Sequence, residues 1–433
     1  MFKLKENGTS TRTELMAGIT TFLTMVYIVV VNPGILADAG VPFEQVFIAT
    51  IIAAAAGTIW MALFANYPIA IAPGMGLNAY FAYSVVGTHG NIDYATAFAA
   101  VFVAGIIFII LSLTPFRSKL IEAIPDNLKH GITAGIGLFI AFIGLRLTGL
   151  ITSHPTNLVA LGDLTSASSV LALVGLAITL ILMALNVNGA LFFGMIATGL
   201  IAYFTGQLSF EQGIMALPSL PEGIIVFNPI DAIGEVVQHG LYAVVFSFLL
   251  VTIFDTTGTM VGVAQQAGLM KNNNLPRARQ ALLSDSVATT IGSMFGTSPT
   301  TAYIESTSGV AAGGRTGLTS LTVGVLFILA AFFGPLVSAV SGISAITAPA
   351  LIIVGSLMMG SIAHIKWGEI DEAFPAFIII LSMPLTSSIA TGIALGFISY
   401  PILKVARGKW KEVHPLVYVF AVLFLYQLAF LPH

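Results

Sequence analysis

Long apolar runs separated by short polar segments fill almost the whole sequence and restrict what the chain can fold into. A helix that crosses a bilayer needs about 20 mostly apolar residues. Candidate runs, seven in each half, lie near residues 15–37, 43–64, 75–87, 94–114, 127–148, 169–186, 189–205, 238–262, 278–296, 300–313, 316–338, 345–364, 372–385 and 388–405. Only 8% of the residues are charged, whereas soluble proteins carry about 25%. The composition predicts an all-α polytopic membrane protein of about 14 spans, and it excludes a nucleic-acid-binding protein or a cytosolic enzyme.

Lysine and arginine predict the orientation, because both are enriched in the cytoplasmic loops of membrane proteins. If the N-terminus lies inside, 15 of the 16 basic residues fall on the inner side and only Arg146 falls outside. The inner residues are Lys3, Lys5, Arg12, Arg117, Lys119, Lys129, Lys271, Arg277, Arg279, Arg315, Lys366, Lys404, Arg407, Lys409 and Lys411. We therefore expect a multi-pass protein of the cell (cytoplasmic) membrane with a cytoplasmic N-terminus. The first run lacks a cleavage site and is expected to be a retained span.

One apolar run, 415–431, is left over once the basic cluster at 404–411 is placed inside. It is either a fifteenth span or a helix that lies along the bundle or the membrane interface.

Two of the runs, 75–87 and 300–313, are too short to cross a bilayer alone, and each follows a segment that contains proline and small residues. They occupy corresponding positions in the two halves, and with seven spans per half the halves have opposite orientations. Paired, interrupted spans of this kind indicate the central site of a transporter. Merely kinked spans are the alternative. As half-helices, the two would direct their positive N-terminal ends toward the middle of the membrane.

Acidic side chains inside apolar runs are costly and are read as functional by default. Asp255 lies deep in the eighth run, and Thr259 shares its helix face. Glu305 begins the second short helix, where a helix cap is the alternative role, and Asn78 lies on the first, where an interhelical hydrogen bond is the alternative. Asp285 lies near the inner surface, and for it a structural role is favoured over the alternative, a place on the transport path. No cysteine and no HExxH spacing is present, so no metal and no cofactor is expected.

The segments APGMGLNAYFAY, FDTTGTMVG, LLSDSVATT and SPTTAYIESTSGV resemble the nucleobase–ascorbate transporter superfamily. The branch that they are most similar to is that of the AzgA-like adenine–guanine–hypoxanthine permeases. The resemblance runs from about residue 10 to residue 411 and implies fourteen spans in two inverted seven-span repeats, with short half-helices at spans 3 and 10. It further implies a core domain (1–114 and 207–338) and a gate domain (115–206 and 339–411), followed by the extra segment 412–433.

By similarity, Asp255 and Glu305 match the two acidic base-binding positions, and Asn78 matches the polar residue of the third span. Tyr303 precedes the second acid, as in uracil-carrying relatives, and is expected to contact the base. Thr259 stands where those relatives have a histidine, so the proton, the family's usual coupling ion, would be carried by Asp255 or Glu305. The aromatic residues Tyr80, Phe81 and Tyr303 are candidates for stacking on the base.

The expected function is therefore import of a purine nucleobase (hypoxanthine, guanine or adenine) by proton symport, with an elevator-type movement of core against gate. A purine base and the lipid bilayer are the expected partners, nucleic acid is not, and a homodimer is left open. Alternatives are an anion exchanger on the same fold and a uracil or xanthine permease. An intramembrane protease would need a reactive serine with a partnering base, or a histidine pair, and the sequence shows neither. No segment of the sequence resembles the selectivity filter of a channel.

Overall fold

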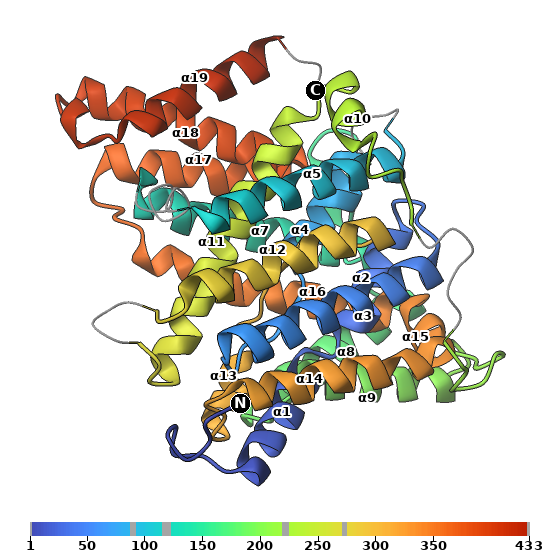
Figure 1. Ribbon diagram of the computed structural model, residues 1–433. Helices are drawn as coiled ribbons and strands as arrows, with labels where there is room; N and C mark the ends of the chain where they lie inside the picture. Colours follow the sequence, from blue (N-terminus) through green and yellow to red (C-terminus); the bar gives the residue numbers. More distant parts are fainter. Residues whose placement is uncertain (1, 87–91, 115–122, 219–224, 271–274, 431–433) are drawn as a thin grey trace.

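The computed structural model describes residues 2–86, 92–114, 123–218, 225–270 and 275–430, and these form a bundle of helices that mostly run side by side (Figure 1). Within these ranges, nine helical stretches are long and apolar enough to cross a membrane. The chain is thus a multi-pass membrane protein of mainly helical fold. The prediction of an all-α membrane fold is confirmed, and the count of fourteen spans stays a prediction.

In the first half of the chain, the described residues form ten helical elements. They are α1 (Thr11–Met25), α2 (Ile28–Ala37), α3 (Phe43–Trp60), the π-helix η1 (Met61–Ala65), α4 (Met75–Ala79), the π-helix η2 (Tyr80–Val86), α5 (Tyr94–Leu113), α7 (Asp126–Leu147), α8 (Ala167–Ala184) and α9 (Ala190–Phe204).

The second half begins with α10 (Ala232–Gln238) and the long helix α11 (Tyr242–Gln266). It continues with α12 (Ala278–Phe295), α13 (Ser306–Ala311), α14 (Gly317–Ala330), the short helix η3 (Ala331–Phe333), α15 (Gly334–Ser341), α16 (Ser344–Met358), η4 (Met359–His364), α17 (Ile370–Thr386), α18 (Ile389–Ala406), η5 (Trp410–Glu412) and α19 (Pro415–Phe430).

Two small antiparallel sheets are present that the hydrophobic pattern did not predict. Strand β1 (Ile71–Pro73) pairs with β4 (Thr300–Ala302), so that the two halves of the chain meet at this point. Strand β2 (Ile151–His154) pairs with β3 (Leu158–Leu161) in a hairpin between α7 and α8. Strands of three and four residues are too short to show a period-2 pattern.

Each predicted span corresponds to a helix or to a broken helix. The first span is interrupted after Met25 and resumes at Ile28, and Pro33 lies inside its second part, where it removes a backbone donor. The two short spans are interrupted as predicted. The span at 75–87 is a five-residue α-helix that continues as a π-helix, and the span at 300–313 is a strand followed by a six-residue helix. Residue 87 lies outside the described residues.

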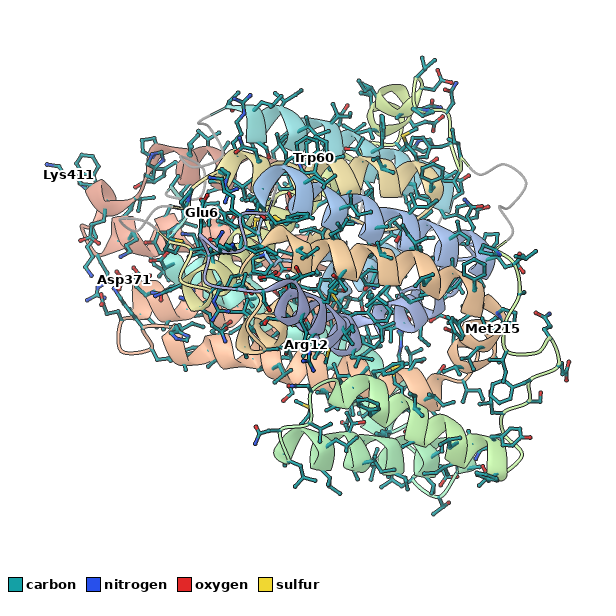
Figure 2. The ribbon with its side chains drawn as sticks, turned by 60° about the horizontal axis from the view of Figure 1, so that its bottom comes forward. Glu6, Arg12, Trp60, Met215, Asp371 and Lys411 are labelled. Atoms are coloured by element: carbon teal, nitrogen blue, oxygen red, sulfur yellow. The ribbon has the colours of Figure 1, made fainter. Side chains whose placement is uncertain are left out.

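A cluster of ion pairs around Asp371, Lys404 and Lys409 lies at one end of the bundle. Figure 2 shows Lys411 and Asp371 at this end and Met215 near the other. Beside Asp371, the Lys409 ammonium forms an ion pair with Glu369 at 3.1 Å, and its hydrogen bond lowers the pKa of that carboxyl group. Arg117, Lys119 and Lys271, which the orientation prediction also uses, lie outside the described residues.

The leftover apolar run forms α19, which packs along α18 (Figure 1). Phe420 and Phe424 contact Phe246 of α11 and Phe397 of α18 through ring pairs 4.9–5.8 Å apart. The opposite face of α19 is exposed, with Val422 at 67% and Tyr426 at 57%. This segment is therefore a helix attached to the bundle by one aromatic face.

Candidate functional site

The β1–β4 pair forms the centre of the candidate site, because each strand leads into one of the short helices. The strands are antiparallel and place Ala72 opposite Thr301. Pairing extends beyond both strands, since Gly74 donates its N–H to the Pro299 carbonyl at 2.9 Å and Tyr303 donates to the Ala70 carbonyl at 3.0 Å. Irregular backbone at this depth is tolerated only where its polar groups find partners inside the protein. These bonds supply the partners.

Side-chain hydrogen bonds lock the two strands to neighbouring helices. The Tyr303 hydroxyl donates to the Pro73 carbonyl at 2.5 Å, which ties the second half of the chain to the end of β1. The Ser306 hydroxyl, on the first residue of α13, accepts from the Ala70 N–H at 3.0 Å. Tyr303 is 5% exposed, and its hydroxyl is used in the bond to the backbone while the residue lies near both acids.

Glu305 precedes α13, as predicted, but its carboxylate does not cap the helix. The Tyr27 hydroxyl donates to Oε1 at 2.7 Å, from the break between α1 and α2. The Thr24 hydroxyl contacts the Glu305 main-chain carbonyl at 3.4 Å. Glu305 keeps part of its surface accessible although Ser306 beside it is fully buried. The Glu305 carboxylate is thus held by Tyr27 and stays partly accessible.

Asp255 reaches the same place from α11. The Thr301 side chain on β4 is positioned to donate to the Asp255 carboxylate, and the next residue, Thr256, accepts from the Ala302 N–H at 3.4 Å. Asp255, Tyr303 and Glu305 lie close enough for their charges to interact. Asp255 is half-buried, like Glu305. The structure therefore brings the two predicted acids together beside Tyr303.

Asn78 lies one turn into the first short helix and is completely buried. Its Nδ2 donates to Asn32 Oδ1 at 3.0 Å. Its Oδ1 is buried, and no group in the described ranges donates to it. An unpaired buried acceptor costs about 1–3 kcal/mol, so this oxygen favours the arrival of a donor.

Two further residues belong to this site that the sequence reading did not single out, Tyr27 and Asn32. Both lie in the first span, where Tyr27 marks the break and Asn32 precedes Pro33. The sequence carried one usable signal, since an Asn-Pro pair inside an apolar run combines a buried polar group with a disrupted helix. Tyr27 offered none, because its neighbours form an unbroken apolar run.

The remaining predicted residues are placed less directly. Thr259 follows Asp255 by one turn of α11 and is half-buried. The Tyr80 ring packs edge-on against Phe248 at 5.1 Å, and Phe81 stacks on Phe98 at 4.4 Å with no exposed surface. Both rings are thus engaged in core packing, so that of the three predicted stacking residues it is Tyr303 that lies near the acids.

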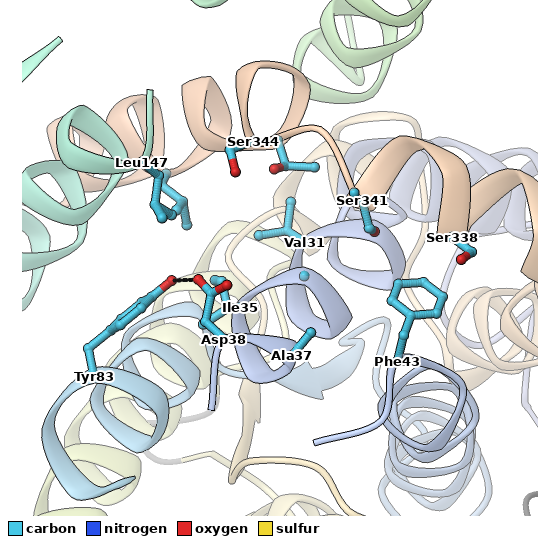
Figure 3. A pocket seen from close by; sticks show the side chains of 14 residues that line it. Val31, Ile35, Ala37, Asp38, Phe43, Tyr83, Leu147, Ser338, Ser341 and Ser344 are labelled. Carbon is cyan, nitrogen blue, oxygen red and sulfur yellow. Dashed lines mark hydrogen bonds between the residues drawn. The ribbon is translucent and has the colours of Figure 1, made fainter. Parts of the chain in front are cut away.

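A separate cavity of about 310 Å³ opens between α2, η2, α3 and the α15–α16 corner. Figure 3 shows the Tyr83 hydroxyl directed at the Asp38 carboxylate, and the two are 2.6 Å apart. The Arg146 guanidinium of α7 lies over the Tyr83 ring at 5.3 Å. Serines 338, 341 and 344 line the facing side. None of the five predicted site residues lines this cavity, so it is distinct from the site around Glu305.

Comparison with known proteins places the chain in a family. The permease family matches residues 12–395. The guanine/hypoxanthine permease PbuO of Bacillus subtilis is 71% identical over 429 residues, with 99% of each chain covered. The adenine permease AdeP of Escherichia coli is 45% identical, with 100% of this chain and 96% of that protein covered.

Solved structures show the fold. The transmembrane domain of the cyanobacterial bicarbonate transporter BicA superposes with a TM-score of 0.64 at 18% identity, covering 88% of this chain and 96% of that domain. The anion transporter Slc26a9 of mouse gives the same TM-score at 14% identity, covering 92% of this chain and 68% of its own. With a family match over most of its length and close relatives that are named permeases rather than enzymes, the chain belongs to the permease family of membrane transporters.

Proposed function

We propose that this protein carries purine nucleobases, namely guanine, hypoxanthine or adenine, across the membrane and that it binds them between the two short helices. The observation that carries the proposal is that two carboxylates, Asp255 and Glu305, approach each other beside the antiparallel β1–β4 pair. The chain is also 71% identical to a guanine/hypoxanthine permease. Purine bases are neutral rings whose edges carry N–H donors, and carboxylates accept from such donors.

The site supports this chemistry because hydrogen-bond acceptors predominate in it. The Glu305 and Asp255 carboxylates and Asn78 Oδ1 all accept, and Tyr303 lies near the two acids. A flat ring stacked on tyrosine with its N–H groups directed at these oxygens would satisfy them together. Thr259 extends the same face of α11 by one turn.

Proton symport is part of the proposal. Within the described residues, Asp255 and Glu305 are the two acids that approach each other in the interior of the bundle at the strand crossing. Two carboxylates in one site repel each other when both are ionised, so one of them is favoured to bind a proton. A proton and a base that occupy the same site are linked in their binding, as coupling requires.

An elevator movement of core against gate is also proposed. Helices α1, α3, α5, α12 and α14 pack on one another, and α7, α8, α16, α17 and α18 form a second packed group. The first group lies within the proposed core (1–114, 207–338) and the second within the proposed gate (115–206, 339–411), which supports the proposal. Their contact includes Gly76 of α4, whose Cα approaches Ile136 of α7 so closely that a Cβ would lie 2.4 Å from the Ile136 side chain.

The proposal includes a cytoplasmic N-terminus and leaves room for a homodimer. The end of the bundle that holds Lys411 and Asp371 would face the cytoplasm, in keeping with the enrichment of basic residues there (Figure 2). On α17, the exposed side chains Ile370, Phe374, Phe377 and Leu381 recur at helical spacing. This stripe of the gate would meet either lipid or a second copy.

An anion exchanger is the alternative that the solved structures favour, because BicA carries bicarbonate and Slc26a9 is an anion transporter. The site argues against it, since Asp255 and Glu305 would repel an anion. A uracil or xanthine permease remains the other alternative, and only transport can separate it from a purine permease.

Uptake of labelled guanine, hypoxanthine and adenine into cells that lack their own purine permeases tests the proposal. We expect saturable uptake of at least one base, loss of accumulation with a protonophore, and little competition from uracil, xanthine or bicarbonate. Strong uracil uptake without purine competition would overturn the choice of substrate. Accumulation that survives the protonophore would overturn the coupling.

A further inference from the structure

The buried amide of Asn78 is the end of a chain of four hydrogen-bonding groups that begins at a main-chain carbonyl. The Thr50 hydroxyl donates to the Val46 carbonyl at 2.6 Å. Asn32 Nδ2 contacts the Thr50 hydroxyl at 2.7 Å, and Asn78 Nδ2 contacts Asn32 Oδ1 at 3.0 Å. Asn32, Thr50 and Asn78 are each fully buried, so water does not compete for these bonds.

The direction of every bond in this chain follows from its first member. A carbonyl can only accept, so the single proton of the Thr50 hydroxyl is used on Val46. The Thr50 oxygen must then accept from Asn32, which requires the NH₂ group of Asn32 to face it. Asn32 consequently presents its carbonyl oxygen to Asn78.

The same reasoning orients Asn78. Because Asn32 offers an acceptor, Asn78 must turn its NH₂ group toward Asn32, and its Oδ1 points away. That oxygen has no partner among the described residues. The second proton of Asn32 Nδ2 is directed at the Thr297 hydroxyl at 2.8 Å, in the segment that leads into β4. Asn32 thus links α3, α4 and the start of the second crossing strand.

We propose that Asn32 is a positioning residue that fixes Asn78 as a hydrogen-bond acceptor, and that this polarity selects bases that present an N–H group at this point. The inference rests on the proposed function and deepens it. A reversed Asn78 amide would present a donor and would select a ring nitrogen or carbonyl instead. The polarity chain Val46–Thr50–Asn32–Asn78 therefore contributes to the ranking of bases without Asn32 or Thr50 touching the ligand.

The ranking that follows is chemical. Guanine and hypoxanthine carry N–H groups on both rings, and guanine adds an exocyclic amine. Adenine has an unprotonated nitrogen at ring position 1, where the other two carry N–H. At ring position 1 an acceptor therefore matches guanine and hypoxanthine better than adenine, whose N–H donors lie on its exocyclic amine and its five-membered ring.

Two variants test the polarity chain, each by removing a different hydrogen-bonding side chain. Asn32→Leu removes the amide, and Thr50→Val removes the anchor while keeping the shape of the side chain. Without the anchor, the Thr297 hydroxyl can donate or accept, so both orientations of the two amides become allowed. We expect KM for hypoxanthine to rise about tenfold in both variants. We also expect the preference among guanine, hypoxanthine and adenine in competition to flatten.

Conservative and matched variants separate positioning from mere structure. A neutral Asn32→Asp side chain still accepts from Asn78 and donates to Thr50, so it should retain the wild-type ranking of bases. Thr198→Val removes a buried threonine that bonds its own helix in the same manner, at 2.7 Å to the Gly194 carbonyl of α9. It should leave KM and ranking unchanged.

The outcomes are separable from those of the proposed function. If the wild-type chain takes up no purine base, the proposed function fails. If the wild type transports purines while Asn32→Leu and Thr50→Val reach the membrane and keep its KM and ranking, the polarity chain is overturned. If Asn32→Leu does not accumulate, Thr50→Val carries the test, and an unchanged ranking in that variant overturns the polarity chain.

Discussion

The Tyr27 hydroxyl donates to the Glu305 carboxylate over 2.7 Å and so joins the break in the first span to the start of the second short helix. The two residues are 278 positions apart in the sequence. This bond holds the carboxylate in a fixed direction beside the β1–β4 pair.

Loss of this bond should weaken transport without unfolding the protein. A hydrogen bond to a charged group contributes about 1.5–3 kcal/mol, so we expect Tyr27→Phe to reduce uptake by about tenfold or more. Initial rates at several base concentrations, normalised to membrane abundance, measure the effect. Tyr418→Phe is the control, because that hydroxyl contacts the Trp410 carbonyl near the start of α19. Equal uptake by Tyr27→Phe and wild type would show that Glu305 needs no orienting donor.

Neutral variants of the two acids should separate proton coupling from binding of the base. Asp255→Asn keeps the shape and the acceptor oxygen of the side chain but removes its charge. If Asp255 carries the proton, we expect accumulation under an imposed pH gradient to be lost in proteoliposomes while exchange of labelled for unlabelled base continues. Glu305→Gln is tested in parallel, and Asp163→Asn, in an exposed loop, is the control. Full proton-driven accumulation by Asp255→Asn would exclude Asp255 as the carrier.

Helices and the paired interruptions could be predicted from the sequence because both have strong local causes. Apolar runs of about 20 residues are stable in a membrane as α-helices. Proline and small residues before 75–87 and 300–313 predicted that the helices there are short. Glu305 and Asp255 were recognisable because acids are so rare at depth. The structure brings these residues together as expected.

Features that depend on distant contacts could not be predicted. Strand β1 has three residues and finds its partner 229 positions later, where Ala72 faces Thr301. The Tyr27–Glu305 and Asn32–Asn78 bonds likewise depend on how helices pack, and no local pattern specifies a partner. Tyr80 and Phe81 lie in the same motif as Asn78 and are used in packing, a distinction that only their neighbours reveal.

Gly76 should be needed for movement as well as for packing. A methyl group there would lie 2.4 Å from the Ile136 side chain, closer than any real contact. Overpacking costs about 1–3 kcal/mol, so we expect Gly76→Ala to separate α4 from α7 and to slow uptake severalfold. Adding Ile136→Ala should restore much of the rate by returning the space. Gly234→Ala, at a glycine with nothing within 4 Å, is the control. Failure of the second substitution to restore uptake would contradict a steric cause.

The ion cluster at the charged end should stabilise the fold rather than take part in transport. Lys404 has a side chain that is 3% exposed, and its ammonium lies 2.7 Å from Glu372, 3.3 Å from Asp371 and 3.1 Å from Glu412. Removing one partner of a buried ion pair costs on the order of 3–5 kcal/mol. Here Glu372 would lose the ammonium that lies 2.7 Å from it, whereas Asp371 keeps its ion pairs with Arg407 and Lys409. We therefore expect Lys404→Met to lower the melting temperature of the detergent-solubilised protein markedly and to reduce its abundance, while the KM of the remaining molecules stays unchanged. Lys411→Met is the matched control, since that side chain lies against the exposed Trp410 ring. A raised KM at normal thermal stability would instead place Lys404 on the transport path.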